Sequence, residues 1–323
     1  MSQDVVKNVV SGVFVIDKPV GLTSHDVVQI VRRGTGIRRA GHTGTLDPRA
    51  SGVLVVLLGP AVRLSEFISA SDKRYQATIR LGSRTETYDA ESEPSEEMPV
   101  DISEDDFIEL IKGFEGESEQ VPPPYSAVKV KGEKAYDLAR KGEEVDLEPR
   151  MINVYNLELL EWAPPEVVVD VYCSSGTYVR SLANDIGEKL GIGAHLVGLR
   201  RTRSGQFSLR DAVSLRRLRE AFDTGTWAEF LIPASEALSD WFTITLDGEL
   251  LELVRHGHRF PAEEGQTGWA RALSEQGDLV ALLEVIESKH IKRVEMSEDT
   301  EAGHHGNEVK GQACPQTKDL QAY

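Results

Sequence analysis

Residues 41–59 read GHTGTLDPRASGVLVVLLG, and this stretch predicts an irregular turn that leads directly into a core strand. From Val53 to Leu58 the side chains are branched and apolar, which is typical of a buried strand. Before it stand two glycines, His42 and the step Asp47-Pro48. An Asp before Pro favours an extended or turn conformation and often closes its own turn. These residues alone fit a turn-forming Asp and a held functional carboxylate about equally well.

Outward from this stretch, alternating or branched apolar residues predict further strands at 13–17, 73–82, 166–173 and 196–209. Helices are expected from Ser24, its N-cap, to Gly34, from Ser103 onward, and over 178–190 with Thr177 as N-cap. Strands and helices follow one another without a regular βαβ alternation. The pattern therefore predicts an α+β sheet with flanking helices rather than a Rossmann or TIM architecture.

The charge of the chain is distributed unevenly. The 323 residues carry a formal net charge of -17, which taken whole argues against a polyanionic partner. However, the first 80 residues are net positive, and the acids gather in residues 81–120 and 221–323. Because electrostatic contacts fall off within about 8–10 Å, local basic patches decide such binding. Residues 84–106 are acidic and poor in apolar groups, so an exposed connection is expected there.

Other bulk features exclude several classes of protein. Two cysteines, Cys173 and Cys314, are too few for a disulfide framework or a multi-cysteine metal site. No charged-then-apolar leader and no apolar run of membrane-spanning length occur, so a cytoplasmic protein without membrane contact is expected. From about Asp240 short strand-like pieces predict a small β-rich module over 241–288. Residues 289–323 are polar and predict a disordered tail.

Arg180 stands out because it lies near the start of its predicted helix, where the helix dipole disfavours a cation. Such local mismatches are expected at functional sites. An Arg at this place needs a carboxylate partner, and a buried Asp needs an Arg. Periodicity cannot show that Arg180 and Asp47 meet.

Five segments together resemble the TruB type of pseudouridine synthases. GHTGTLDP resembles the motif that carries the essential Asp, and DKPVGLTSHDVV resembles the N-terminal motif. DKRYQATIRLG resembles the strand that carries the active-site tyrosine. QVPPPYSAVKVKGEKAYDLARKG resembles the RNA-binding thumb, and CSSGTYVRSLANDIGEKLGIGAHLVGLRRTRSG resembles the arginine-bearing motif. The segments occur in family order across roughly residues 12–205.

The resemblance implies a fold and its domains. It implies a mixed, mainly antiparallel pseudouridine-synthase sheet with flanking helices as a catalytic domain over 1–240, and a thumb-like RNA-binding insertion at about 120–150. It implies a PUA-like character for the module at 241–288. That module is short and acidic, with Arg255, Arg259 and Arg271 as its cations, which departs from a strong RNA-binding module.

The resemblance also implies roles for individual residues. Asp47 matches the nucleophile, Tyr75 the aromatic that stacks on the target base, and Arg180 the arginine that pairs with the carboxylate. Around the base, His42 matches a residue that holds the flipped nucleotide, and Tyr178 and Leu199 match pocket residues. Lys18 and Pro19 lie in the first motif and are given a supporting role. Whether the Asp first attacks the base or C1′ stays open.

The implied activity is isomerisation of uridine 55 in the T-loop of tRNA, because the thumb-like segment resembles that of the stand-alone bacterial enzymes. The reaction implies no cofactor and no metal, and the expected protein is a monomer without an obligate protein partner. Candidate contacts to the RNA backbone are the cations of the basic clusters: Arg32, Arg33, Arg38, Arg39, Lys129, Lys131, Arg200, Arg201 and Arg203.

Other classes of function remain as alternatives. The basic patches alone also suit a non-catalytic RNA-binding or tRNA-folding factor. A glycosidase acting on small sugars usually needs a second carboxylate about 5–10 Å from the first, and the stretch around Asp47 offers none. A soluble α+β binding module without activity is the third alternative.

Overall fold

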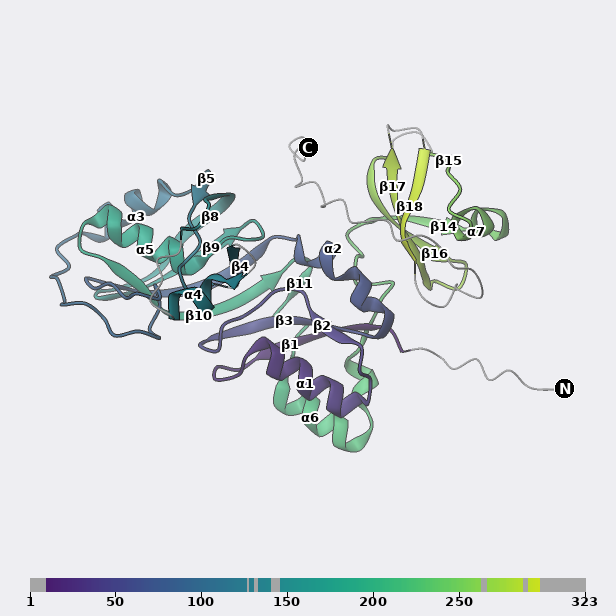
Figure 1. Cartoon of the computed structure of the whole chain (residues 1–323), viewed down its shortest axis with the longest axis horizontal. Coiled ribbons are helices and arrows are strands. Elements are labelled where there is room, and N and C mark those ends of the chain that lie inside the picture. The colour runs from purple at the N-terminus through teal and green to yellow at the C-terminus, as the bar shows by residue number, and fades with distance from the viewer. Residues whose placement is uncertain are drawn as a thin grey trace.

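The computed structural model describes residues 10–126, 128–130, 133–140, 146–262, 266–286 and 290–296 (Figure 1). Within these ranges the chain forms one large mixed sheet with flanking helices and a smaller five-stranded sheet. The predicted α+β class is therefore confirmed. The predictions for Lys131 and for residues 297–323 lie outside the described residues. No helix in the described ranges is long and apolar enough to span a membrane.

The large sheet has the main strand order β12-β1-β3-β10-β4-β9-β8-β5. These strands are β1 (Gly12–Lys18), β3 (Ala50–Leu58), β4 (Lys73–Leu81), β5 (Gly116–Gln120), β8 (Arg150–Ala163), β9 (Glu166–Cys173), β10 (Ala194–Ser204) and β12 (Val213–Ser214). Three short strands join it: β2 (Ala40–His42), β11 (Phe207–Ser208) and β13 (Ile232–Pro233). The main-path neighbours are antiparallel except β1–β12 and β3–β10. The predicted strands at 13–17, 73–82 and 166–173 are thus confirmed, and the predicted strand at 196–209 is two strands, β10 and β11. The residue pattern did not predict β5 and β8.

The apolar run of β3 is explained by burial on both faces of the sheet. Leu54, Val56 and Leu58 pack into one core cluster together with α1 (Ser24–Thr35) and α5 (Val179–Leu190). The alternate side chains, from Val53 to Leu57, pack into a second cluster on the opposite face, with η1 (Gly59–Leu64) and α2 (Ser65–Ser69). Because successive strand residues point to opposite faces, a strand covered on both sides needs a continuous apolar run.

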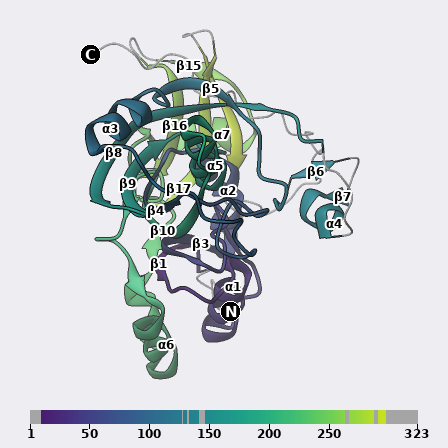
Figure 2. The same ribbon diagram turned by 90° about the vertical axis from the view of Figure 1, so that its left-hand side faces the viewer.

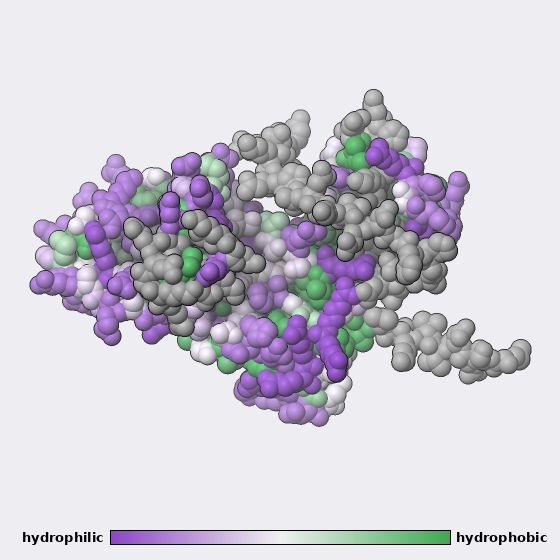
Figure 3. Space-filling view, in the orientation of Figure 1, coloured by the Kyte–Doolittle hydropathy of each residue, from purple (hydrophilic) through white to green (hydrophobic). Residues whose placement is uncertain are grey.

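Helices cover the sheet unevenly. On the β1 side, α1 lies next to α6 (Leu215–Thr224), and the short helix η2 (Trp227–Phe230) follows α6 (Figure 1). Toward the other end α5 packs on β10, and α3 (Glu104–Lys112) packs on β8. Their outer surface is polar, as the hydrophilic side chains over α1 and α6 show in Figure 3. The apolar stripes of the helices therefore face the sheet.

Strand β4 shows the alternation that the sequence predicts. Tyr75, Ala77 and Ile79 are buried, whereas Arg74 and Gln76 are exposed. One face of the sheet is thus open to solvent here, which is common in antiparallel sheets. The alternation places Tyr75 on the covered face.

Gly52 allows β3 and β10 to approach closely next to the Asp47 turn. Its φ is 98°, and a Cβ at this position would lie 2.2 Å from the carbonyl oxygen of Arg201. Any larger residue would need both a disfavoured backbone conformation and a wider strand spacing. This contact brings Arg201 directly beside the start of β3.

The C-terminal module is a sheet in the order β14-β16-β17-β18-β15 with one helix, α7 (Gly248–Arg255). Its strands are β14 (Phe242–Leu246), β15 (Phe260–Pro261), β16 (Gly268–Ser274), β17 (Leu279–Ile286) and β18 (His290–Met296). The expected module end at 288, with a tail from 289, is wrong. β18 pairs with both β17 and β15, because β17 would otherwise present an unpaired edge.

The thumb-like segment contains the hairpin β6 (Lys129–Val130) and β7 (Glu133–Lys134), followed by α4 (Ala135–Arg140). Figure 2 shows these elements standing apart from the sheets. Within this segment the rings of Tyr125 and Tyr136 pack against each other, with their centroids 6.1 Å apart.

Two predicted helix caps and one predicted loop need correction. The N-cap of α1 is Thr23, whose side chain closes a capping box with Asp26, and the neighbouring Ser24 bonds elsewhere. The N-cap of α5 is Tyr178, not Thr177, and its side chain makes no capping bond. Residues 84–106 are not wholly exposed, since the first part of that segment turns into the protein.

Two buried lysines make the stability of the fold depend on pH. Burial lowers the pKa of Lys18 and of Lys73 to about 8 from their ordinary 10.5. Between these values the unfolded chain binds more protons, so the free energy of unfolding rises with pH. We expect it to rise from pH 7 to 9 by about 1 kcal/mol for each lysine.

Urea unfolding at pH 7, 8 and 9 measures this rise. The pH window ends at 9 because burial raises the pKa of the Cys173 thiol to about 12, which acts in the opposite direction above its ordinary 9.0. The variant Lys73→Met should show a smaller pH slope. A flat or falling slope in the unsubstituted protein would contradict the expectation.

Candidate active site

The turn that carries Asp47 is held by its own hydrogen bond and by two neighbouring segments. Within the turn, Ala50 N donates to the Asp47 carbonyl at 3.0 Å; from the loop before α1, Gly21 N donates to the Pro48 carbonyl at 2.7 Å. From α1, the Ser24 hydroxyl bonds both backbone groups of Leu46, at 2.8 and 3.0 Å. The Asp47 side chain remains 38% exposed. A carboxylate is thus fixed at the start of β3 and stays accessible.

Arg180 lies next to Asp47, a pairing that the resemblance implies and that periodicity alone could not show. Its Nε lies 3.3 Å from Asp47 Oδ2, and its side chain is only 10% exposed. The guanidinium does not form a bidentate contact with the Asp47 carboxylate. Instead, Nη1 lies 3.4 Å from Asp89 Oδ2 and donates to the Tyr125 carbonyl at 3.1 Å. The guanidinium therefore bridges two carboxylates and the first residues of the thumb-like segment.

Asp89 is the functional residue that sequence reasoning missed. It is 6% exposed, and its Oδ1 accepts from Thr87 Oγ1 at 2.6 Å and from Glu91 N at 2.9 Å. The preceding Tyr88 has φ 62°, an uncommon conformation that turns the chain at this point. The only sequence signal is an acid surrounded by small hydroxyl residues that bond it. It stands in a segment whose acidity predicts exposure.

The sequence argues against a glycosidase because the stretch around Asp47 offers no second carboxylate. Asp89 supplies a second carboxylate near Asp47, so that argument no longer holds. The oxygens of Asp89 are, however, already engaged by Thr87, Glu91 N and Arg180. A general acid needs a free oxygen directed at its substrate. The arrangement therefore suits one accessible carboxylate with a buried partner rather than an acid–base pair.

Two aromatic side chains of the predicted set, Tyr75 and His42, lie on the strands β4 and β2. Tyr75 on β4 is 9% exposed and pairs across the ladder with Arg201 on β10; burial raises the pKa of its hydroxyl. His42 on β2 has a buried Nδ1 without a hydrogen-bond partner among the described residues, and burial lowers its pKa. A neutral imidazole with an unused polar atom is available to a ligand.

Tyr178 lies at the start of α5, and Leu199 lies in the middle of β10. The backbone of Tyr178 is bonded by Gln120, which accepts from its N at 2.8 Å and donates to its carbonyl at 3.1 Å. Its ring lies beneath the guanidinium of Arg150, 5.5 Å from the centroid. Leu199 pairs with Ala50 at the start of β3 and is partly buried. Both residues thus stand near Asp47 through their elements.

Lys18 supports the loop that is hydrogen-bonded to the Asp47 turn. It is fully buried, and its Nζ donates to the carbonyls of Pro19 at 3.0 Å and of Leu22 at 2.6 Å. These carbonyls frame the loop whose Gly21 N holds the Pro48 carbonyl. The supporting role expected for Lys18 and Pro19 has a structural path to Asp47 through this loop.

The structure divides the nine candidate RNA-contacting cations. Arg201 is wrong as a surface contact: it is 2% exposed, and its guanidinium donates to the carbonyls of Val53 at 2.7 Å and Gly44 at 3.1 Å. Arg200, its neighbour, points to the opposite face of β10 and pairs with Asp17 at 3.0 Å. One arginine is structural, and the other lies away from the Asp47 turn.

The other candidates differ in accessibility. Arg32 donates to the Ala40 carbonyl at 2.6 Å and is partly buried. Arg33, Arg38 and Arg203 are exposed, and Arg39 is partly exposed. Lys129 lies on β6 without a described side chain, and Lys131 lies outside the described residues.

Replacing Arg201 tests its structural assignment. Arg201→Met leaves carbonyl oxygens of the Asp47 turn and of β3 without a donor, so we expect the free energy of unfolding to fall by about 3 kcal/mol. Exposed Arg33→Gln serves as the control and should change it by less than about 0.5 kcal/mol. Urea unfolding measures both. Equal unfolding curves for Arg201→Met and the unsubstituted protein would contradict a structural role.

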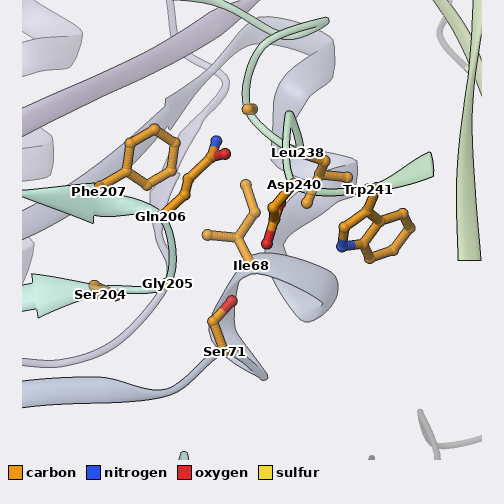
Figure 4. Close-up of a pocket in the computed structure, with 10 residues that line it drawn as sticks. Ile68, Ser71, Ser204, Gly205, Gln206, Phe207, Leu238, Asp240 and Trp241 are labelled. Atoms are coloured by element: carbon orange, nitrogen blue, oxygen red, sulfur yellow. The ribbon is translucent and has the colours of Figure 1, made fainter. Parts of the chain in front are cut away.

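A separate depression lies between the large sheet and the C-terminal module (Figure 4). It is lined by the turn at 204–207, by Ile68 and Ser71, and by Leu238, Asp240 and Trp241. None of these residues belongs to the Asp47 set, so the depression is not the candidate site. Among the described residues no cluster of His, Cys, Asp and Glu could hold a metal ion.

Two family models match neighbouring parts of the chain. The model of the TruB family pseudouridylate synthase N-terminal domain matches residues 32–179. The model of the tRNA pseudouridylate synthase B C-terminal domain matches residues 180–239. The two matches join in the sequence at Arg180, so the Asp47 turn and most of α5 fall in different matched segments.

Curated relatives are similar along most of their length. Proteins named tRNA pseudouridine synthase B are 41% identical in Nitrosococcus oceani, over 82% of this chain and 87% of the relative. The corresponding figures are 44%, 76% and 84% in Clostridium tetani, and 38%, 88% and 95% in Pseudomonas aeruginosa.

Solved structures show the same fold. A chain of a Cbf5-Nop10-Gar1 complex superposes with a TM-score of 0.68 at 29% identity, covering 94% of this chain and 85% of that one. A chain of an H/ACA RNP bound to a substrate RNA containing 2'-deoxyuridine gives 0.66 at 27% identity, covering 94% and 86%.

Proposed function

The chain belongs to the TruB family of tRNA pseudouridine synthases, and from this premise we propose that it isomerises uridine 55 in the T-loop of tRNA. The observation that carries the chemistry is Asp47, an accessible carboxylate fixed against the buried guanidinium of Arg180. The choice of uridine 55 is supported by residues 120–150, which resemble the thumb of the stand-alone bacterial enzymes. The relatives' name supports tRNA as the substrate.

The reaction exchanges one bond of the base for another. The N1–C1′ bond of uridine breaks, the uracil turns, and C5 bonds to C1′; the C5 proton is lost and N1 gains one, so the isomer has the same atoms. Asp47 serves as a nucleophile that adds either to the base or to C1′ and then leaves. The carboxylate acts as the anion, and the neighbouring Arg180 guanidinium orients it. The sequence of steps is redox-neutral and calls for no cofactor.

Access to the target base requires that the nucleotide leave its stack, at a cost of a few kcal/mol. We assign Tyr75 as the aromatic surface for the flipped uracil, since stacking recovers about 1–3 kcal/mol per base. The buried, unpartnered Nδ1 of His42 suits a contact to the extruded nucleotide. Tyr178 and Leu199 complete the base pocket in this proposal.

We propose the following roles for the domains. Residues 1–240 form the catalytic domain, with the thumb-like insertion beside the Asp47 site through the Arg180–Tyr125 bond. The exposed Arg33, Arg38 and Arg203 are the remaining backbone contacts among the described arginines of the candidate set. The five-stranded C-terminal sheet is assigned as a weak, PUA-like RNA contact, because its sequence is acidic. The enzyme is proposed to act as a monomer.

Mapping of the product tests the assignment. The purified protein is incubated with a tRNA transcript, and pseudouridine is located by chemical modification and primer extension. We expect one pseudouridine, at position 55, and none in a transcript with cytidine at that position. A product at another uridine would overturn the substrate position but not the chemistry. Free uracil or ribose would overturn the chemistry.

A further inference from the structure

Three acidic side chains gather around the Asp47 site, whereas the buried cations beside them are paired within the protein. Beyond Asp47 and Asp89, Glu91 lies close by, because its backbone N donates to Asp89 Oδ1 at 2.9 Å. The pKa of the Glu91 carboxyl is raised by partial burial and by the nearby Asp89 and Asp47 carboxylates. Arg180 is the cation between two of these three acids. A phosphodiester next to a flipped uridine must approach this group of carboxylates, so it needs a cation.

The buried cations around Asp47 are already engaged. Arg180 bonds two carboxylates and a carbonyl, Lys18 bonds two carbonyls, and Arg201 bonds the carbonyls of the turn. Each is at most 9% exposed. None of them can turn to a phosphate without leaving a buried acceptor unpaired.

Arg49 is different. It stands two residues after Asp47, is exposed, and makes no hydrogen bond or ion pair with a residue that the structure describes. Hydrogen bonds to the carbonyls of Asp47 and Pro48 fix the backbone of the turn, so Arg49 is carried beside the Asp47 carboxylate. An arginine fork matches the two oxygens of a phosphate.

Resting on the proposed function, we propose that Arg49 binds the phosphate next to the flipped uridine. Its guanidinium is exposed two residues from Asp47 and is not engaged by a carboxylate or carbonyl of the described residues, so it can turn to a phosphate without leaving a buried acceptor unpaired.

The test uses RNA binding as well as turnover, so that it does not depend on catalysis. Arg49→Gln should lower kcat/KM about tenfold, mainly through KM, and should reduce the slope of log Kd against log salt by about one. Arg219→Gln, an exposed arginine on α6, is the matched control and should change neither quantity.

A neutral phosphate locates the contact. T-stem-loop RNAs carry a methylphosphonate either before or after the target uridine, and binding is measured to the unsubstituted protein and to Arg49→Gln. One of the two RNAs should bind the unsubstituted protein about tenfold more weakly and Arg49→Gln no more weakly than normal RNA does. Independent, additive losses, or an unchanged salt slope, would overturn the proposal. Absence of pseudouridine with intact binding would instead overturn the proposed function.

Discussion

Asp47→Asn is expected to abolish pseudouridine formation, lowering kcat by at least about 10⁴-fold, while the Kd for tRNA stays within about threefold. The amide has the shape of the carboxylate and can still accept a hydrogen bond from Arg180 Nε, so the turn should keep its place. It cannot act as an anionic nucleophile. Single-turnover modification of a tRNA transcript and filter binding measure the two effects.

Asp17→Asn provides a matched control for this substitution. The Asp17 carboxylate is 33% exposed and pairs with an arginine at 3.0 Å, as Asp47 is 38% exposed and pairs at 3.3 Å, but it lies on the opposite face of the sheet. Asp17→Asn should leave kcat for pseudouridine formation unchanged. If Asp47→Asn kept its activity, the nucleophile would be another residue. If a non-catalytic tRNA-folding factor were correct, neither variant would differ from the unsubstituted protein.

Strands such as β3 and β4 could be predicted, because the order of apolar and polar side chains along a strand follows which of its faces are buried. The β4 residues alternate because one face meets solvent, and the β3 run is continuous because both faces are covered. Such patterns report burial but not the partner. The end of the C-terminal sheet was therefore missed: β18 completes it with polar residues such as His290 and Lys292, whose composition is typical of a tail.

The site could be predicted only in part. Asp47 and Arg180 come from motifs, but Asp89 shares its segment with many exposed acids and is buried by a turn at Tyr88 that composition does not show. Likewise, Arg200 and Arg201 are adjacent and chemically identical. Because successive residues of β10 point to opposite faces of the sheet, Arg200 forms a surface ion pair, whereas Arg201 is buried and bonds backbone carbonyls next to the turn. Long-range packing decides these cases, and the spacing of residues along the sequence does not show which segments pack together.

Arg180→Met is expected to destabilise the protein by about 3–5 kcal/mol and to reduce modification to background. Two carboxylates then stand close together without their shared cation, and one of them, Asp89, is almost fully buried. Arg180→Lys keeps one charge but loses the fork that reaches Asp47, Asp89 and Tyr125 together. We expect it to fold and to lower kcat about 10²- to 10³-fold, with KM changed little.

The double variant Arg180→Met/Asp89→Asn separates the two roles of this arginine. The amide that replaces the Asp89 carboxylate would keep an acceptor for Thr87 Oγ1 and Glu91 N without a buried charge, so most of the lost stability should return. Activity should not return, because Asp47 still lacks the guanidinium that orients its carboxylate. Urea unfolding and single-turnover modification distinguish these outcomes. Recovery of activity together with stability would show that Arg180 only neutralises Asp89 and does not position Asp47.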